Sequence, residues 1–145
     1  MSSLHASPQA VIEESHRAWA EFVKGRSGRA RALFSKQDDV SLGNPFGPFV
    51  RGWHNVQQTM DRAATAFRDG EVVGFETVSR HLTGELACYV ENERYRATIG
   101  GEAELSHVSL RVTTVLRREE EGWKIVHRHA DPITTARPAK SVIQE

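Results

Sequence analysis

Hydrophobic positions in the first half of the chain recur every three to four residues, the spacing that places them on one face of a helix. Three helices follow from this pattern. The first is expected over about residues 8–24, with Ser7 as its N-cap and Pro8 at its first position. The second is expected over residues 26–35, and the third between Gly52 and Asp69-Gly70.

From Glu71 onward, apolar positions alternate with polar ones, which is the period of a β-strand. Four long strands are expected, over about residues 72–82, 86–98, 105–118 and 122–131. The short turns between them imply an antiparallel meander. Two further short strands are expected between Val40 and Gly52. Helices followed by a long antiparallel sheet predict an α+β domain, with the sheet curved around the helices.

Length and composition narrow the class of protein. The 145 residues fit one domain over residues 1–145, with an ordered core at about 8–132 and a frayed tail at 133–145. Positive and negative side chains balance to a formal charge of +0, which argues against nucleic acid or an anionic membrane as a partner. The chain shows neither a membrane-spanning apolar run nor a signal peptide, so a cytoplasmic protein is expected.

The last strong strand carries ionisable side chains where a plain strand would carry valines. Its odd-numbered positions form one face, made of Trp123, Ile125, His127, His129 and Asp131. Its even-numbered positions form the other, made of Lys124, Val126, Arg128 and Ala130. An even-numbered loop in the last hairpin would put Thr114 opposite His127 and Val112 opposite His129. The histidines would then share the apolar interior.

The preceding hairpin adds carboxylates to the same interior. With a loop centred on Gly101-Glu102, Val112 faces Glu91 and Leu110 faces Glu93. Tyr89 and Tyr95 then join this face. A bulge, or a slip by one residue, would instead turn the glutamates outward and bring in Asn92 and Arg94.

A carboxylate and an imidazole in an apolar pocket suit general acid–base chemistry. The candidate catalytic residues are His129 and Glu91, followed by His127 and Asp131. The alternative interpretation is that these histidines only hydrogen-bond their neighbours, and that the inward glutamates pair with arginines at the sheet edge. The other residues expected to bind a substrate are Trp19, Phe22, Asn44, Tyr89, Glu93, Val112, Thr114 and Trp123. The expected ligand is small, and either hydrophobic or polar-headed.

Motifs for other chemistries are missing from the sequence. His127 and His129 could both reach one metal, but no HExxH or CxxC pattern accompanies them. No GxSxG occurs, and the single cysteine, Cys88, has no recognisable catalytic partner. Neither a metal nor a cofactor is therefore expected.

The stretch Leu110–Pro132 resembles the C-terminal hairpin of SnoaL-like and ketosteroid-isomerase-like members of the NTF2-like superfamily, and Gly52-Trp53 resembles the same group. The resemblance covers about residues 8–132. It implies a cone-shaped α+β fold, with three N-terminal helices packed on a strongly curved, mostly antiparallel sheet. It also implies cofactor-free isomerase, cyclase or dehydratase chemistry on a hydrophobic, carbonyl-bearing substrate. The alternative is a non-catalytic ligand-binding or dimerisation module.

The resemblance further implies a homodimer packed through the outer sheet face. Val126 and Ala130 would then meet the partner, and Arg111 and Arg128 could pair across the interface. Ketosteroid isomerases use a tyrosine in the first helix and a buried aspartic acid, whereas the first helix here offers Trp19 and no residue matches that aspartic acid. Genuine steroid isomerisation is therefore not expected.

Overall fold

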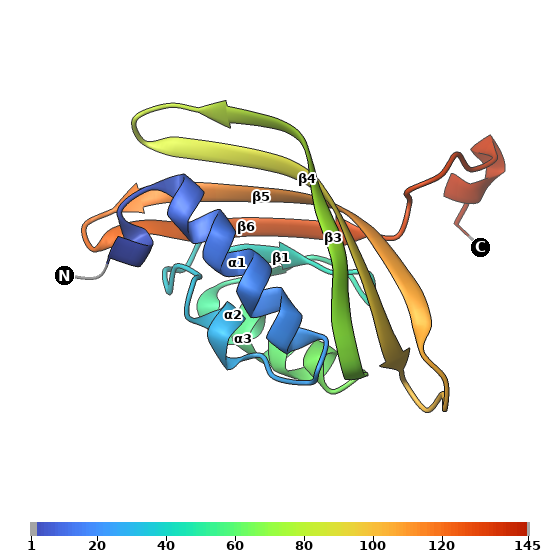
Figure 1. The fold of residues 1–145 in the computed structure, drawn as a ribbon. Coiled ribbons are helices and arrows are strands. Elements are labelled where there is room, and N and C mark those ends of the chain that lie inside the picture. The colour runs from blue at the N-terminus through green and yellow to red at the C-terminus, as the bar shows by residue number, and fades with distance from the viewer. Residues whose placement is uncertain (1–2, 145) are drawn as a thin grey trace.

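The computed structural model describes residues 3–144, and its helices lie against one side of a curved sheet (Figure 1). The helices are α1 (Pro8–Phe22), α2 (Gly28–Arg31) and α3 (Trp53–Ala64), with two 3₁₀ turns, η1 (Ser3–His5) and η2 (Ala139–Val142). The strands are β1 (Ser41–Gly43), β2 (Val50–Arg51), β3 (Phe67–Leu82), β4 (Leu86–Ile99), β5 (Ser106–Glu119) and β6 (Gly122–Asp131). The predicted α+β fold is confirmed.

The strands form one sheet in the order β2-β1-β6-β5-β4-β3. Strands β3 to β6 make the antiparallel meander that the turn lengths predict, and β1 joins β6 in parallel. Figure 1 shows the long strands bending along their length, so that α1, α2 and α3 lie within the curve. The interior between the helices and the bent sheet is where the hydrophobic core sits.

Helix α1 follows its sequence signals closely. The Ser7 hydroxyl accepts a hydrogen bond from the backbone N–H of Ala10 at 3.1 Å, as an N-cap does. The helix ends at Phe22, two residues before the expected end, and Gly25 follows with a φ of 96°. Its buried face carries Trp19 and Phe22 into the core.

The third helix is shorter than predicted, because β3 already begins at Phe67. Asp69-Gly70 therefore does not end a helix; it forms an irregularity in β3, where the pairing with β4 shifts. The backbone N–H of Gly70 donates to the Val23 carbonyl at 3.0 Å, and a Cβ at Gly70 would clash with that oxygen. Only glycine allows β3 to approach the end of α1 this closely.

The second helix is also shorter than predicted, with one turn over Gly28–Arg31 in place of residues 26–35. The chain that follows it runs beside β6. There the Ser35 N–H donates to the carbonyl of Ile125 at 2.8 Å, and the Ile125 N–H donates to the carbonyl of Leu33 at 2.9 Å. The backbone of this segment thus finds its partners on the sheet instead of within a helix.

The predicted register between β4 and β5 is confirmed. Glu91 lies opposite Val112, and Glu93 lies opposite Leu110. Both glutamates are buried, so their side chains do face the interior.

The predicted register between β5 and β6 is wrong beyond Ile125. Leu116 pairs with Ile125 as the alternation requires, but Val115 pairs with His127, so Val126 is an extra residue in a bulge. Thr114 consequently lies opposite Arg128 instead of His127, and Val112 lies opposite Ala130 instead of His129.

The bulge exchanges the two faces of β6 from His127 onward. Arg128 and Ala130 become buried, whereas His127, His129 and Asp131 turn to the outer face of the sheet. The expected dimer surface changes accordingly, because Ala130 and Arg128 do not belong to the outer face. A homodimer through that face stays a prediction, and sedimentation equilibrium of the native chain is the measurement that checks it.

Beyond β6 the chain runs away from the sheet and ends in η2, none of whose residues is buried (Figure 1). Among the described residues, no helix is long and apolar enough to cross a membrane.

Candidate functional site

A cavity of about 300 Å³ lies inside the curve of the sheet. The cavity is lined by α1, by α3, by the loop after β1 and by the interior sides of β4, β5 and β6. Its wall is almost wholly apolar, and Arg128 is the charged side chain on it. The lining residues are Trp19, Phe22, Val23, Leu42, Asn44, Pro45, Phe46, Met60, Ala63, Phe67, Tyr95, Ile99, Val108, Leu110, Arg128, Ala130 and Pro132.

Arg128 is held in place by Glu93. The guanidinium donates two hydrogen bonds to the carboxylate, from Nη1 at 2.9 Å and from Nη2 at 2.8 Å. Both residues are buried, with exposed fractions of 5% for Arg128 and 1% for Glu93. The Tyr95 hydroxyl donates to the same carboxylate at 2.5 Å. Such a bidentate, charge-assisted pair fixes the plane of the guanidinium.

The electrostatics of this cluster keep Glu93 ionised. Burial by itself would raise the pKa of Glu93, but the charge and hydrogen bonds of Arg128 hold that pKa below its usual range. Burial and the neighbouring Glu93 carboxylate raise the pKa of Tyr95 well above its usual value, so Tyr95 remains a hydroxyl donor. Arg128 and Glu93 therefore neutralise each other, and the cluster carries no surplus charge.

Arg128 still has donors to offer. An arginine has five N–H groups, and the pair with Glu93 uses two, which leaves three. The guanidinium carbon lies 3.9 Å from the centroid of the Trp19 ring, so the indole packs against one face of the guanidinium. A ligand in the cavity would meet an oriented cationic donor on an otherwise apolar wall.

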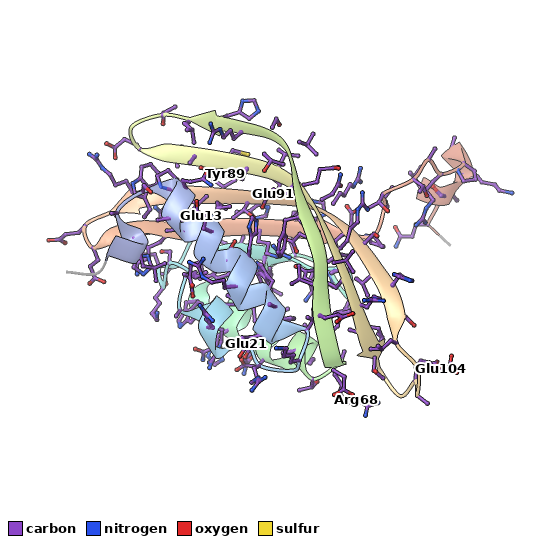
Figure 2. All side chains as sticks on the ribbon, in the orientation of Figure 1. Glu13, Glu21, Arg68, Tyr89, Glu91 and Glu104 are labelled. Atoms are coloured by element: carbon purple, nitrogen blue, oxygen red, sulfur yellow. The ribbon has the colours of Figure 1, made fainter. Side chains whose placement is uncertain are left out.

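A second buried carboxylate lies farther along β4. Figure 2 shows Tyr89 and Glu91 reaching from β4 toward α1. Glu91 binds His16 Nε2 through both oxygens, at 2.9 and 3.2 Å, and the His16 ring stacks on Phe75 with centroids 3.9 Å apart. Neither Glu91 nor His16 lies on the cavity wall. The prediction that Glu91 pairs with His129 of β6 is therefore wrong, because the imidazole that Glu91 binds is that of His16 in α1.

The three other candidate catalytic residues lie outside the interior. The Ser41 hydroxyl is hydrogen-bonded to His127 Nδ1 at 2.7 Å, and burial, aided by the nearby His129, lowers the pKa of His127. His129 lies 3.3 Å from Asp131, which in turn accepts a hydrogen bond from Arg111 at 2.7 Å. The prediction that these residues close a pocket is wrong, because the bulge at Val126 turns them outward.

The predicted ligand-binding residues divide into two groups. Trp19, Phe22 and Asn44 line the cavity, and Glu93 lies directly behind Arg128. The other four face the interior but do not reach the cavity wall: Tyr89, Val112, Thr114 and Trp123. Tyr89 instead donates a hydrogen bond to Gln9 at 3.1 Å.

Arg128 and Ala130 were missed because strict alternation assigns them to the outer face. The sequence did contain one indication of a role for Arg128. A glutamate that is predicted to be interior needs a cation or several hydrogen-bond donors, and β6, two strands away from β4, carries such a cation. Nothing in the sequence pairs His16 with Glu91, which lies 75 residues away along the chain. Within residues 3–144, no group of three or more His, Cys, Asp or Glu side chains could hold a metal ion.

A family model described as a SnoaL-like domain matches residues 12–134. No curated protein matches the sequence.

Three solved structures illustrate the likeness in fold. A candidate calcium/calmodulin-dependent protein kinase type II association domain from Thiobacillus denitrificans is 20% identical, with 92% of this chain and 100% of that chain covered and a TM-score of 0.74. A ketosteroid isomerase-like protein from Erwinia carotovora atroseptica is 16% identical, with 93% and 100% covered and a TM-score of 0.69. A candidate dehydratase of the NTF2-like family from Streptomyces avermitilis is 19% identical, with 88% and 100% covered and a TM-score of 0.67. At these identities the likeness shows the NTF2-like fold alone.

Proposed function

Because the chain belongs to the SnoaL-like domain family, and because its fold encloses a cavity with one oriented cationic donor, we propose that it binds a small apolar molecule that carries a neutral oxygen acceptor. A ketone carbonyl is the simplest such group. It would accept a hydrogen bond from Arg128, and the apolar body would fill the space toward α3.

The observation that carries this proposal is the charge balance at Arg128. Glu93 already neutralises the guanidinium, so a bound carboxylate would add an uncompensated charge to an apolar cavity. A carbonyl oxygen adds no net charge and still uses a free N–H group. The walls supplied by Trp19, Phe22 and Met60 suit hydrocarbon.

The cavity volume sets the size of the ligand. At roughly 30 Å³ for each water-sized group, about 300 Å³ accommodates on the order of ten non-hydrogen atoms. Medium-chain methyl ketones have this size and carry one carbonyl at the end, so they are suitable probes.

Ala130→Leu is expected to weaken ketone binding strongly while the fold is kept. Ala130 lies on the cavity wall, so the larger side chain would occupy the space that the ligand needs. Titration calorimetry with a medium-chain methyl ketone should show the affinity falling by at least about tenfold, because several methylene groups of the ketone can no longer be buried in the cavity.

The matched control is His129→Leu, at the residue that directly precedes Ala130 in β6. That side chain lies on the outer face, so the affinity should stay within about twofold of the native value. Equal affinities in all three proteins would contradict the proposal, as would a loss confined to His129→Leu.

Acid–base chemistry on the bound ligand remains a prediction. The interior carboxylate–imidazole pair is Glu91 with His16, and Phe75 and Tyr95 lie between this pair and the cavity, so it would act on a ligand only through an intervening water. Exchange of the protons next to the carbonyl of a bound ketone, followed by NMR in deuterated water, is the measurement that checks it.

A further inference from the structure

A second hollow lies directly outside the cavity. Its volume is about 390 Å³, and it runs between the loop after β1 and the C-terminal half of α3. The residues along it are Asn44, Phe46, Gly47, Pro48, Val50, Thr59, Arg62, Ala63 and Ala66. We call this hollow the outer groove. It shares Asn44, Phe46 and Ala63 with the inner cavity, so the two spaces meet at these residues.

Phe46 is the large side chain at this meeting point. Its ring centroid lies 6.0 Å from that of Phe67, which lines the inner cavity, yet 56% of Phe46 is exposed. A phenylalanine this exposed gains little from burial, so packing does not account for its place. The Phe46 ring therefore lies between the inner cavity and the outer groove.

The loop presents Phe46 in a defined way. The Asn44 side-chain oxygen accepts a hydrogen bond from the backbone N–H of Phe46 at 3.0 Å, which closes an Asx turn. Pro45 within the turn and Pro48 two residues after it each fix a further backbone angle. The backbone is thus held, whereas more than half of the Phe46 side chain faces solvent.

We propose that the Phe46 ring separates the outer groove from the ligand site, and that Phe46 thereby sets the length of ligand that the site accepts. This inference rests on the proposed function. The ligand class that would fit both spaces is an elongated, flexible molecule with a carbonyl near one end. With its carbonyl at Arg128, such a molecule would extend along the outer groove only where the side chain at position 46 is small, and its far end would then emerge near Thr59 and Arg62.

Phe46→Ala tests this inference with straight-chain methyl ketones of increasing length. In the native protein, affinity should rise until about ten non-hydrogen atoms fill the inner cavity and should then level off. In Phe46→Ala the rise should continue, by up to about fourfold for each further buried methylene group, and reach at least about tenfold for the longest ketones. Short ketones should show no such gain, because they do not reach beyond the inner cavity that Phe46 lines.

Phe49→Ala is the matched control. Phe49 lies in the same loop and is 64% exposed, but it lines neither space and packs near the outward-facing rings of His127 and His129. The dependence of affinity on ketone length should be the same in Phe49→Ala as in the native protein.

Two results would overturn the inference while the proposed function stands. One is a Phe46→Ala profile that levels off at the native length. The other is a native profile that keeps rising without a limit. A native protein that binds no ketone of any length would instead overturn both the inference and the proposed function.

Discussion

Arg128→Met is expected to lower the free energy of unfolding at neutral pH by about 3–5 kcal/mol. The variant removes the only cation hydrogen-bonded to Glu93 among the described residues and leaves a carboxylate that is almost fully buried. The Tyr95 hydroxyl remains as a donor, but it brings no charge. Urea unfolding followed by tryptophan fluorescence measures the loss.

The double variant Arg128→Met with Glu93→Gln shows how much of that loss comes from the unpaired buried carboxylate. With the charge gone from both partners, at least about half of the lost stability should return. Arg111→Met is the control, because it breaks a partly exposed pair with Asp131 and should cost no more than about 1 kcal/mol. Equal losses in Arg128→Met and Arg111→Met would show that the interior pair does not hold the fold together.

The pH dependence gives the same test a second readout. In the native protein the pKa of Glu93 is lowered, so its contribution to stability is present above the unfolded pKa of about 4.3 and is lost as pH falls through the folded pKa. In Arg128→Met, burial without the cation should raise the folded pKa of Glu93 above the unfolded value. The free energy of unfolding of Arg128→Met should then fall as pH rises through that folded pKa. The difference in this free energy between the variant and the native protein should therefore narrow in acid.

Trp19→Ala is expected to cost about 3–5 kcal/mol, the usual range for a buried tryptophan. The indole is buried, packs against Arg128 and contacts the edge of Phe22 with ring centroids 4.9 Å apart. Trp53→Ala is the matched control. Trp53 is only partly buried and has Lys36 5.1 Å from its ring, so its removal should cost about half as much or less.

The space left by Trp19 joins the existing cavity, which allows a rescue experiment. An aromatic molecule such as indole should bind there and restore about 2–3 kcal/mol when its concentration is about a hundred times its dissociation constant. Trp53→Ala should gain nothing from indole. Equal losses in the two tryptophan variants, with equal responses to indole, would place Trp19 outside any continuous cavity.

The strength and the limit of sequence reasoning both show in the last three strands. Between β4 and β5, alternation and a short turn were enough to place Glu91 opposite Val112, because no irregularity interrupts that pair. Between β5 and β6, one extra residue at Val126 reversed every later position. A bulge of this kind leaves no mark in an alternating sequence, since both faces of the strand carry polar residues there.

The candidate site was therefore predicted in part. Trp19, Phe22 and Asn44 do lie on the cavity wall, and the helix periodicity and turn chemistry that place them there are local signals. Arg128 and Ala130 depend on the bulge, and the contact of His16 with Glu91 depends on how α1 crosses the sheet. Such contacts are set by tertiary packing, which a single sequence does not encode position by position.

The carbonyl resonance of a bound ketone tests the role of Arg128 most directly. A medium-chain methyl ketone with a ¹³C-labelled carbonyl should, once bound, resonate downfield of its position in hydrocarbon, because a hydrogen bond from the guanidinium polarises the C=O group. His129→Leu should leave that shift unchanged. A bound carbonyl that resonates as it does in hydrocarbon, or whose shift moves when His129 is replaced, would contradict Arg128 as the anchor of the site.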